Sequence, residues 1–509
     1  MLFNSGVFLQ FFAAFLLFYW LVRNHLRARN VLIVAASYLF YGWWDWRFLG
    51  LLLFSSTFDY CVGLGLERLT HPRQRRALLA GSVLVNLGIL SFFKYGNFFV
   101  ESMAALLSRL HVPFHTSTLA IILPVGISFY TFQSMSYALD VYRRQLKPTR
   151  NFVNFLAYVS FFPQLVAGPI QRAGHLLPQF ERTVVITRAM LEEGVWLMLW
   201  GMFKKVALAD NLAPLADLVY SHTAFNGAAV VLGTLAFGFQ IYCDFSGYSD
   251  LARGLARVLG FDILWNFNLP YSATQLREFW RRWHIGLSTW LRDYLYISLG
   301  GNRLGPRRTY ANLILTMGLG GLWHGAAWNF VLWGLWHGAG LAVERACTRG
   351  RQDAPETPGP SPELAERPSP HPRPPSEPDL AGPAPQRAAD DRPARPAAGS
   401  LSWVRWGFTM LFVFYGWLLF RARSWSQIVA MTRALADVSL PAWTMSFLLN
   451  LAVFTLPLLV MEAWQLRARN RLAPLSAPAA ARLCLQGALL ASTILFWEKK
   501  QSTFIYFQF

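Results

Sequence analysis

The sequence predicts an all-α, polytopic integral membrane protein. Of its 509 residues, 54% are hydrophobic and only 14% are charged, and the mean hydropathy is +0.31. Soluble domains have about 25% charged residues. Backbone groups in lipid must be hydrogen-bonded within their own segment, and the apolar runs are too long for barrel strands. The chain is therefore expected to be almost entirely helical.

Apolar runs of membrane-spanning length recur along almost the whole chain. Several are short or interrupted, so we expect roughly ten to twelve transmembrane helices, with the remaining runs re-entrant or interfacial. The first run is predicted to be a retained helix, because the N-terminus has neither a basic region nor a small-residue cleavage site. The runs cover residues 6–22, 30–45, 48–66, 77–94, 118–140, 151–168, 187–208, 226–243, 309–322, 326–345, 402–421, 444–463 and 480–497.

The segment 270–308 has a different pattern. Tryptophans and aliphatic residues alternate there with arginines and a histidine, as in Trp280-Arg-Arg-Trp-His284. The segment is too polar to span a bilayer and amphipathic enough to lie at, or dip into, its interface.

Between Cys347 and Ser400 the composition changes to proline, alanine and charged residues. Such a segment cannot bury enough apolar surface to fold. We therefore expect a membrane-embedded core at 1–347, a disordered loop at 348–400, and C-terminal transmembrane helices at 401–509 that complete the same domain. The alternative for the loop is a proline-rich docking segment, for which composition alone identifies no partner.

The net charge of +19 does not indicate a nucleic-acid partner. The basic residues lie in short loops between apolar runs, and no basic face carries base-stacking aromatics. The lipid bilayer is the expected partner instead. The basic loops at 23–29, 68–76 and 143–150 are predicted to face the cytoplasm, which places the N-terminus on the opposite side.

His324 is the first candidate for a catalytic residue. It lies in an apolar segment between Trp323 and Gly325, followed by Trp328, and an ionisable group at membrane depth is functional by default. A neutral imidazole can take a proton from a hydroxyl near pH 7, so this position suits acyl transfer. The two tryptophans would line a tunnel and exclude water. A histidine that merely links two helices by a hydrogen bond is the alternative.

His284 is the second candidate. It follows Arg277, Arg281 and Arg282 on a short amphipathic segment, and grouped arginines suit the phosphates of an acyl donor such as coenzyme A. Anchoring to anionic lipid headgroups explains the arginines equally well. His284 would then be a second catalytic group or a hydrogen-bond partner in the tunnel.

Other polar residues in apolar runs are given weaker roles. Asp244 and Asp250 are expected to pair with arginines elsewhere or to line the tunnel, and His337 is expected to be structural. No metal site is predicted, because the candidate ligands are too few and wrongly spaced. Signatures of soluble nucleotide-binding units and of serine hydrolases are absent from the sequence.

Long motifs make the chain resemble the membrane-bound O-acyltransferase family, and within it the bacterial proteins that O-acetylate alginate. The resemblance extends over nearly the whole chain outside the proline-rich insert. The motifs include Arg277-Glu-Phe-Trp-Arg-Arg-Trp-His284, Gly321-Leu-Trp-His324-Gly, Phe92-Phe-Lys-Tyr95, Asp244-Phe-Ser-Gly-Tyr-Ser-Asp250 and Phe504-Ile-Tyr-Phe-Gln-Phe509.

The resemblance implies a ring of helices around a thin central region with a tunnel from the cytoplasmic side. His324 matches the family's invariant histidine and His284 its second histidine. Such proteins of the bacterial inner membrane take acetyl from cytoplasmic acetyl-CoA, with no bound cofactor. They pass it across the membrane to periplasmic acetyltransferase partner proteins, which complete the transfer to a polysaccharide acceptor.

Two other functions stay open at this point. A transporter or flippase without bond chemistry would also need the spans and buried polar groups, although the internal repeats common in transporters are not apparent. A membrane-bound O-acyltransferase that acts on a lipid, peptidoglycan or another acceptor would use the same residues.

Overall fold

The computed structural model describes residues 1–112, 121–166, 168–352, 400–497 and 504–505, and every regular element among them is a helix. The prediction of an all-α membrane protein is thereby confirmed. Five described segments are long and apolar enough to cross a membrane. They are Trp46–Arg68, Pro72–Arg109, Gly227–Val258, Ser402–Arg421 and Thr444–Ala468.

This number is smaller than the ten to twelve spans expected from the sequence. Two further described helices, Gly6–Val22 and Ala479–Leu495, are apolar but shorter. The other predicted runs form helices that are broken by turns or carry several polar side chains. Length and hydropathy alone therefore do not identify them as spans.

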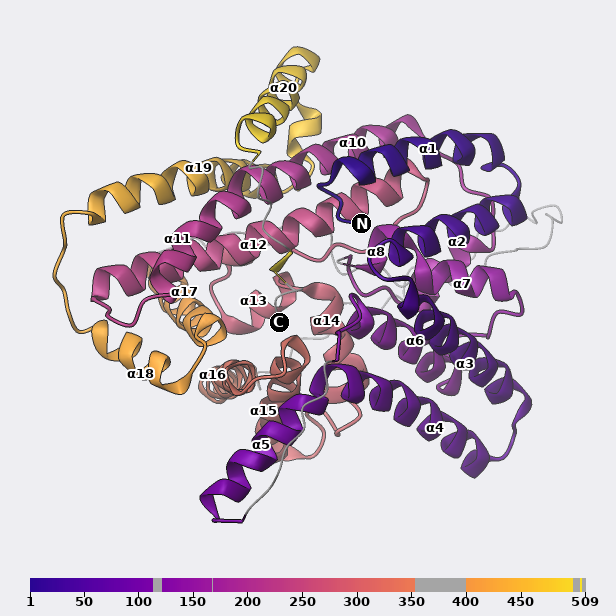
Figure 1. Ribbon diagram of the computed structural model, residues 1–509, viewed down its shortest axis with the longest axis horizontal. Helices are drawn as coiled ribbons and strands as arrows, with labels where there is room; N and C mark the ends of the chain where they lie inside the picture. Colours follow the sequence, from indigo (N-terminus) through magenta and orange to yellow (C-terminus); the bar gives the residue numbers. More distant parts are fainter. Residues whose placement is uncertain (113–120, 167, 353–399, 498–503, 506–509) are drawn as a thin grey trace, which may run out of the picture.

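Most helices of the N-terminal part form a group on one side of the molecule, at the right in Figure 1, whereas α5 extends at the bottom of the view. In this part α6 begins nine residues later than the predicted run at 118, after Gly126, whose backbone is left-handed (φ 76°). The elements are α1 (Gly6–Val22), α2 (Leu26–Gly42), η1 (Trp46–Phe48), α3 (Leu49–Arg68), α4 (Pro72–Leu90), η2 (Ser91–Tyr95), α5 (Gly96–Arg109), α6 (Ile127–Tyr142), α7 (Phe152–Ser160), α8 (Phe162–Leu165) and α9 (Ala173–Phe180).

The run predicted at 151–168 is one of those that are broken. Helix α7 ends at Ser160, and Pro163 follows in the first turn of α8. Proline removes a backbone donor and favours the start of a helix over its interior. The Phe162 N–H at the break donates to Ser37 Oγ at 3.1 Å, so this buried donor has a side-chain partner.

The longest described helix, α12, ends later than the sequence predicted. The apolar run was expected to end at 243, but the helix continues to Val258 through Asp244 and Asp250. These carboxylates, for which the sequence suggested either arginine partners or a place in the tunnel wall, pair with Lys205 (2.8 Å) and Lys204 (2.7 Å). The ion pairs compensate the charges inside the bundle. The neighbouring elements are α10 (Arg188–Met202), η3 (Phe203–Ala209), α11 (Asp210–Tyr220) and α12 (Gly227–Val258).

The segment 270–308 forms short helices in the middle of the view in Figure 1, inside the larger helices that surround it. Its amphipathic sequence predicted a segment that does not span, and the chain indeed turns several times here. The elements are η4 (Pro270–Ser272), α13 (Leu276–Arg282), α14 (Ile285–Trp290) and η5 (Leu291–Tyr296).

Helices α15 (Gly305–His324) and α16 (Trp328–Gln352) form a tightly packed antiparallel pair. At Gly321 an added Cβ would collide with the Phe330 carbonyl, and at Gly334 with the Met317 carbonyl. Small residues allow membrane helices to approach closely. This contact fixes the end of α15, where His324 is the last helical residue.

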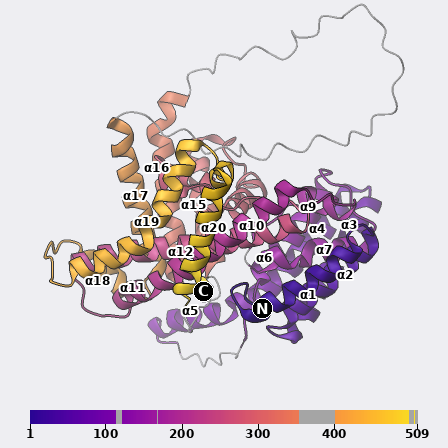
Figure 2. The ribbon, with the colours of Figure 1, turned by 90° about the horizontal axis from the view of Figure 1, so that it is seen from above.

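The C-terminal elements pack on the same helices. Figure 2 shows α17 beside α16, and the structure places α19 against α12 and α20 against α10. Helix α16 continues to Gln352 and α17 begins at Ser400, so the ends of the predicted 348–400 loop are helical, and residues 353–399 lie outside the described part. The elements are α17 (Ser400–Arg421), α18 (Trp425–Ala434), α19 (Thr444–Ala468), η7 (Ala473–Ser476) and α20 (Ala479–Leu495).

Candidate active site

His324 lies at the C-terminal end of α15 in an aromatic enclosure. Its side chain is buried, with 3% of the residue exposed. The ring centroids of Trp333, Trp323 and Phe420 lie 5.0, 5.1 and 5.6 Å from that of the imidazole. Aromatic rings exclude water and lower the local polarity, which strengthens any electrostatic interaction with a substrate.

His284 lies next to His324, although the two are 40 positions apart in the chain. Their ring centroids are 6.3 Å apart, and His284 is fully buried. His284 precedes α14 in a left-handed conformation (φ 43°), which is rare for a residue with a side chain. Such strained positions cluster at functional sites. The structure therefore brings the two predicted catalytic histidines together.

Asn266 determines which nitrogen of His284 carries the proton. The Gly286 N–H donates to Asn266 Oδ1 at 3.2 Å, which identifies this atom as the amide oxygen. His284 Nδ1 lies 3.1 Å from the same oxygen and must therefore be the donor. In the neutral ring the lone pair is then on Nε2.

The end of α15 is held by two side chains from the π-helical turn η2. Lys94 Nζ donates to the carbonyl oxygens of Trp323 (2.6 Å) and His324 (3.1 Å). The Tyr95 hydroxyl donates to the carbonyl oxygen of Leu322 at 2.9 Å. Three consecutive carbonyl groups at the helix end are thus hydrogen-bonded by side chains.

The two tryptophans predicted to line a tunnel lie in different surroundings. Trp323 is buried between the histidines and α6, with its ring 5.8 Å from that of His284 and 5.4 Å from Phe129. Trp328 is 66% exposed and packs on Phe98. The structure brings the first tryptophan to the histidine pair and leaves the second at the surface.

The three arginines predicted to bind an acyl donor also differ. Arg282 is buried and forms a 2.5 Å ion pair with Glu278. The backbone N–H of Arg277 donates to the carboxylate of Glu344, which caps the N-terminus of α13. Arg281 is exposed. A buried, paired guanidinium is committed to its partner, and removing either one leaves an unpaired charge, whereas an exposed guanidinium can reach an anion.

Asp244 lies in the middle of α12 and belongs to a buried ion network. Lys205 Nζ lies 2.8 Å from Asp244 Oδ1 and 2.7 Å from Asp210 Oδ1. The backbone N–H of Ile505 donates to the other oxygen of Asp244 at 2.6 Å. The next residue, Phe245, packs against His284 with ring centroids 4.6 Å apart. Asp244 therefore supports the wall behind His284.

His337 is fully buried behind the pair. Its ring lies 5.1 Å from Trp333, which also contacts His324, and it packs edge-on against Trp280 at 5.2 Å. An added Cβ at Gly416 would come within 2.7 Å of His337 Nε2. Such close packing fits the structural role expected from the sequence.

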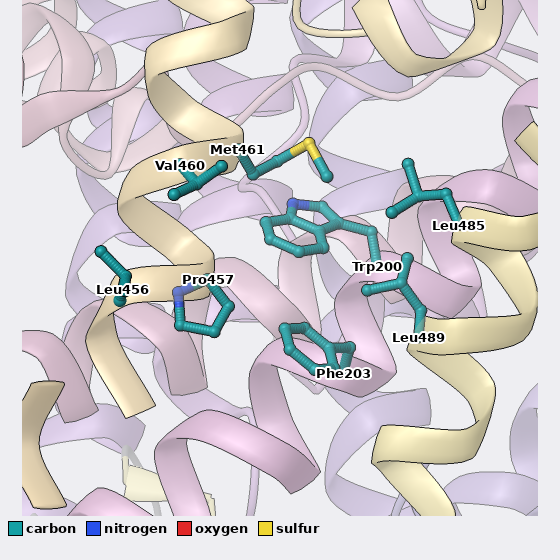
Figure 3. A pocket seen from close by; sticks show the side chains of 8 residues that line it. All are labelled: Trp200, Phe203, Leu456, Pro457, Val460, Met461, Leu485 and Leu489. Atoms are coloured by element: carbon teal, nitrogen blue, oxygen red, sulfur yellow. The ribbon is translucent and has the colours of Figure 1, made fainter. Parts of the chain in front are cut away.

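An apolar cavity of about 320 Å³ lies apart from the histidines, between α10, η3, α19 and α20 (Figure 3). Its lining contains no acid, base or nucleophile, so it offers no catalytic group. Within the described residues, no group of three or more His, Cys, Asp or Glu side chains is arranged to hold a metal ion. The cavity is lined by Trp200, Phe203, Leu456, Pro457, Val460, Met461, Leu485 and Leu489.

Sequence reasoning gave no role to Lys94, Tyr95 or Asn266. A usable signal existed for Lys94, since it is a charged residue within the apolar run at 77–94 and the criterion that identified His324 applies to it equally. For Asn266 there was none, because asparagine is common in the turns that connect helices.

Comparisons with known proteins identify the family of the chain. The model of the membrane-bound O-acyltransferase family matches residues 143–358, which include both histidines. A probable alginate O-acetylase of Azotobacter vinelandii is 42% identical over 479 residues, which cover 92% of this chain and 85% of that protein. The chain belongs to the membrane-bound O-acyltransferase family.

More distant relatives act on other cell-envelope polymers. A peptidoglycan O-acetyltransferase of Helicobacter pylori is 36% identical, with 68% of this chain and 71% of that protein covered. A teichoic acid D-alanyltransferase of Streptococcus thermophilus is 28% identical, with 56% and 74% covered. These names share one reaction class, and the protein is a membrane O-acyltransferase.

Proposed function

We propose that this protein takes acetyl from cytoplasmic acetyl-CoA and passes it across the bacterial inner membrane for O-acetylation of an extracytoplasmic polysaccharide, an alginate-like polymer in the first instance. The observation that carries the proposal is the buried pair of His324 and His284 with centroids 6.3 Å apart. The names of the relatives that cover most of the chain support the acceptor class. Periplasmic acetyltransferase proteins are the expected partners.

His324 is assigned as the general base. Its neutral imidazole removes the proton from the hydroxyl that first receives the acetyl group, on the partner protein or on the polysaccharide itself, as that oxygen attacks the thioester carbonyl carbon. The carbon–sulfur bond breaks, and the departing thiolate takes the proton from the imidazolium. The products are the acetyl ester and free coenzyme A, so atoms and charge balance without a bound cofactor.

His284 is assigned a supporting role in the same step. Its Nδ1–H is held by Asn266, so its Nε2 is oriented by the protein and not by solvent. Of the arginines proposed to contact the donor's phosphates, Arg281 and Arg277 retain that role, while Arg282 is committed to Glu278. Trp323 is proposed to line the tunnel beside the histidines, whereas Trp328 is too exposed to do so.

The proposal is tested by the O-acetyl content of exported polysaccharide in a deletion strain complemented with wild type or with His324→Ala. We expect wild type to restore acetylation and the variant to reduce it by about 100-fold or more, the contribution of a general base. Membrane levels of both proteins are measured in parallel. Near-normal acetylation by His324→Ala would contradict catalysis by this residue and favour transport.

Peptidoglycan is the second candidate acceptor, favoured by the 36% identity to the Helicobacter pylori enzyme. The two acceptors are separated by measuring ester-linked acetate in purified cell wall and in exported polysaccharide from the same strains. Loss of acetate only from the wall would replace the proposed acceptor and leave the role of His324 unchanged.

A further inference from the structure

We propose that Lys94 and Tyr95 are positioning residues for the transfer reaction: together they clamp the C-terminal turn of α15 and thereby set the position of His324. This inference rests on the proposed catalytic role of His324. It assigns a function to two residues that hold α15 through its backbone carbonyl groups.

The clamp consists of three hydrogen bonds to consecutive carbonyl groups. Tyr95 holds Leu322 at 2.9 Å, and Lys94 holds Trp323 at 2.6 Å and His324 at 3.1 Å. Helix α15 ends at His324, and the next residue, Gly325, is extended (φ −161°). The clamp therefore contacts the last three helical residues.

These carbonyl groups need partners from outside the helix. The last four carbonyls of any helix have no intrahelical donor, and water or side chains must satisfy them. In a membrane-embedded and largely aromatic environment, an unsatisfied carbonyl is costly. Without Lys94 and Tyr95 the last turn would loosen, and the imidazole attached to it would move relative to His284.

A lysine is well suited to this place. The C-terminus of a helix carries a partial negative charge, which an ammonium group stabilises. The same Lys94 Nζ lies 5.7 Å from the ring centroid of Trp323, within reach of a cation–π interaction. Trp323 in turn contacts His284, so one ammonium group restrains the walls around both histidines.

The backbone of η2 supports a functional assignment. Lys94 and Tyr95 lie in a π-helical turn, Ser91–Tyr95, within the otherwise α-helical segment Pro72–Arg109. Single π-helical turns inside helices are rare and occur frequently at functional sites. Here the turn presents two adjacent side chains to the same end of α15.

The test uses membranes from the complemented deletion strain, which contain the full-length protein, supplemented with the periplasmic fraction and the exported polysaccharide of that strain. The rate of thiol release from acetyl-CoA is measured over a range of donor concentrations, and kcat is normalised to the amount of protein. The variants are Lys94→Met, Lys94→Arg, Tyr95→Phe and His324→Ala. Tyr60→Phe is the matched control, because the Tyr60 hydroxyl donates a comparable 2.7 Å bond to the Arg150 carbonyl far from the site.

Lys94→Met is expected to lower kcat by about ten- to 100-fold, the effect of misplacing a catalytic group by about 1 Å. The KM for acetyl-CoA should change by less than about threefold, since donor binding is not altered. Lys94→Arg, which keeps the charge and donors, should restore part of the loss. Tyr95→Phe should have a smaller effect in the same direction, and Tyr60→Phe none.

A wild-type kcat in both Lys94→Met and Tyr95→Phe would overturn the clamp. A change confined to KM would overturn it as well, because it would indicate a donor contact. If Lys94→Met does not accumulate in membranes, Lys94→Arg and Tyr95→Phe decide the question by the same criteria.

His324→Ala separates the clamp from the proposed function. An active His324→Ala variant would contradict both, since the clamp acts through this histidine. An inactive His324→Ala variant combined with fully active Lys94→Met and Tyr95→Phe variants would contradict the clamp alone. If the clamp acts through His324, the double variant Lys94→Met/His324→Ala should have the same kcat as His324→Ala alone, because the two residues act as a unit.

Discussion

At the scale of single residues, the site depends on groups that orient the histidines as much as on the histidines themselves. Asn266 is the clearest case, since one amide oxygen accepts bonds from both His284 Nδ1 and the Gly286 N–H. That oxygen fixes the tautomer of the ring and the start of α14 at once. Replacing Asn266 is therefore expected to change the orientation of His284 and to alter contacts with substrate only indirectly.

Asn266→Ala is therefore expected to lower acetyl transfer by about tenfold or more, within the range that a correctly oriented acid–base group contributes. Asn266→Asp keeps an acceptor for Nδ1–H and should retain more activity. The check is the polysaccharide O-acetyl content, with membrane protein levels compared between the two variants. Equal activity of Asn266→Ala and wild type would show that His284 needs no partner on Nδ1.

Substitutions of the two neighbouring arginines, Arg281 and Arg282, should have different effects, because only Arg282 is buried and forms an ion pair. Arg282→Met leaves Glu278 without its 2.5 Å ion-pair partner and is expected to lower the melting temperature of the purified protein. Arg281→Met, at an exposed position, should leave the melting temperature unchanged and raise the KM for acetyl-CoA. Thermal unfolding and donor titration of both variants check this, and an unchanged KM in Arg281→Met would remove Arg281 from the donor site.

At the scale of elements, close helix packing through small residues holds the bundle together. Helices α10 and α12 approach at Gly201, where an added Cβ would come within 2.6 Å of the Gly247 carbonyl oxygen, and at Gly194, where it would come within 2.9 Å of the Gly254 oxygen. Backbone this close cannot move aside cheaply. Helix α12 carries Phe245 against His284, so this packing also places one wall of the site.

Gly201→Ala is expected to destabilise the protein by roughly 1–3 kcal/mol, the usual cost of overpacking. Gly487→Ala on α20 is the control, since nothing lies within 4 Å of its added Cβ and alanine favours the helix. Thermal unfolding in detergent should show a lower midpoint only for Gly201→Ala. A similar midpoint for both variants would mean that α10 and α12 can separate at no cost.

At the scale of the whole molecule, the helices before and after the proline-rich insert form one packed unit. Helices α17 and α19 pack against α12, and α17 also packs against α16, so the chain returns to the same core after residue 400. The composition of the segment between α16 and α17 predicted a disordered loop or a docking segment, and that prediction concerns residues outside the described part.

Because the helices on both sides of it pack on the same core, replacement of residues 353–399 by a flexible Gly/Ser linker is expected to leave acetylation within about twofold of wild type. The entropy of loop closure changes only slowly with loop length and composition. The measurement is polysaccharide O-acetyl content in the complemented deletion strain. A large loss with normal protein levels would support the alternative of a docking segment for a partner.

Hydropathy was enough to predict the class of fold, because burial in lipid leaves hydrophobic runs few alternatives to helices. The sequence also made His324 a candidate, because a titratable group in an apolar segment is costly, and His284 a candidate, because it lies beside grouped arginines. Which polar residues lie together at the site follows from the packing of the helices. The tertiary structure paired Arg282 with Glu278, left Trp328 exposed, extended α12 past Asp244, and placed Lys94 on the end of α15. Apart from the i,i+4 pair of Arg282 and Glu278, these outcomes depend on packing between segments far apart in the chain, such as Lys94 and His324. Hydropathy is a local property and does not contain them.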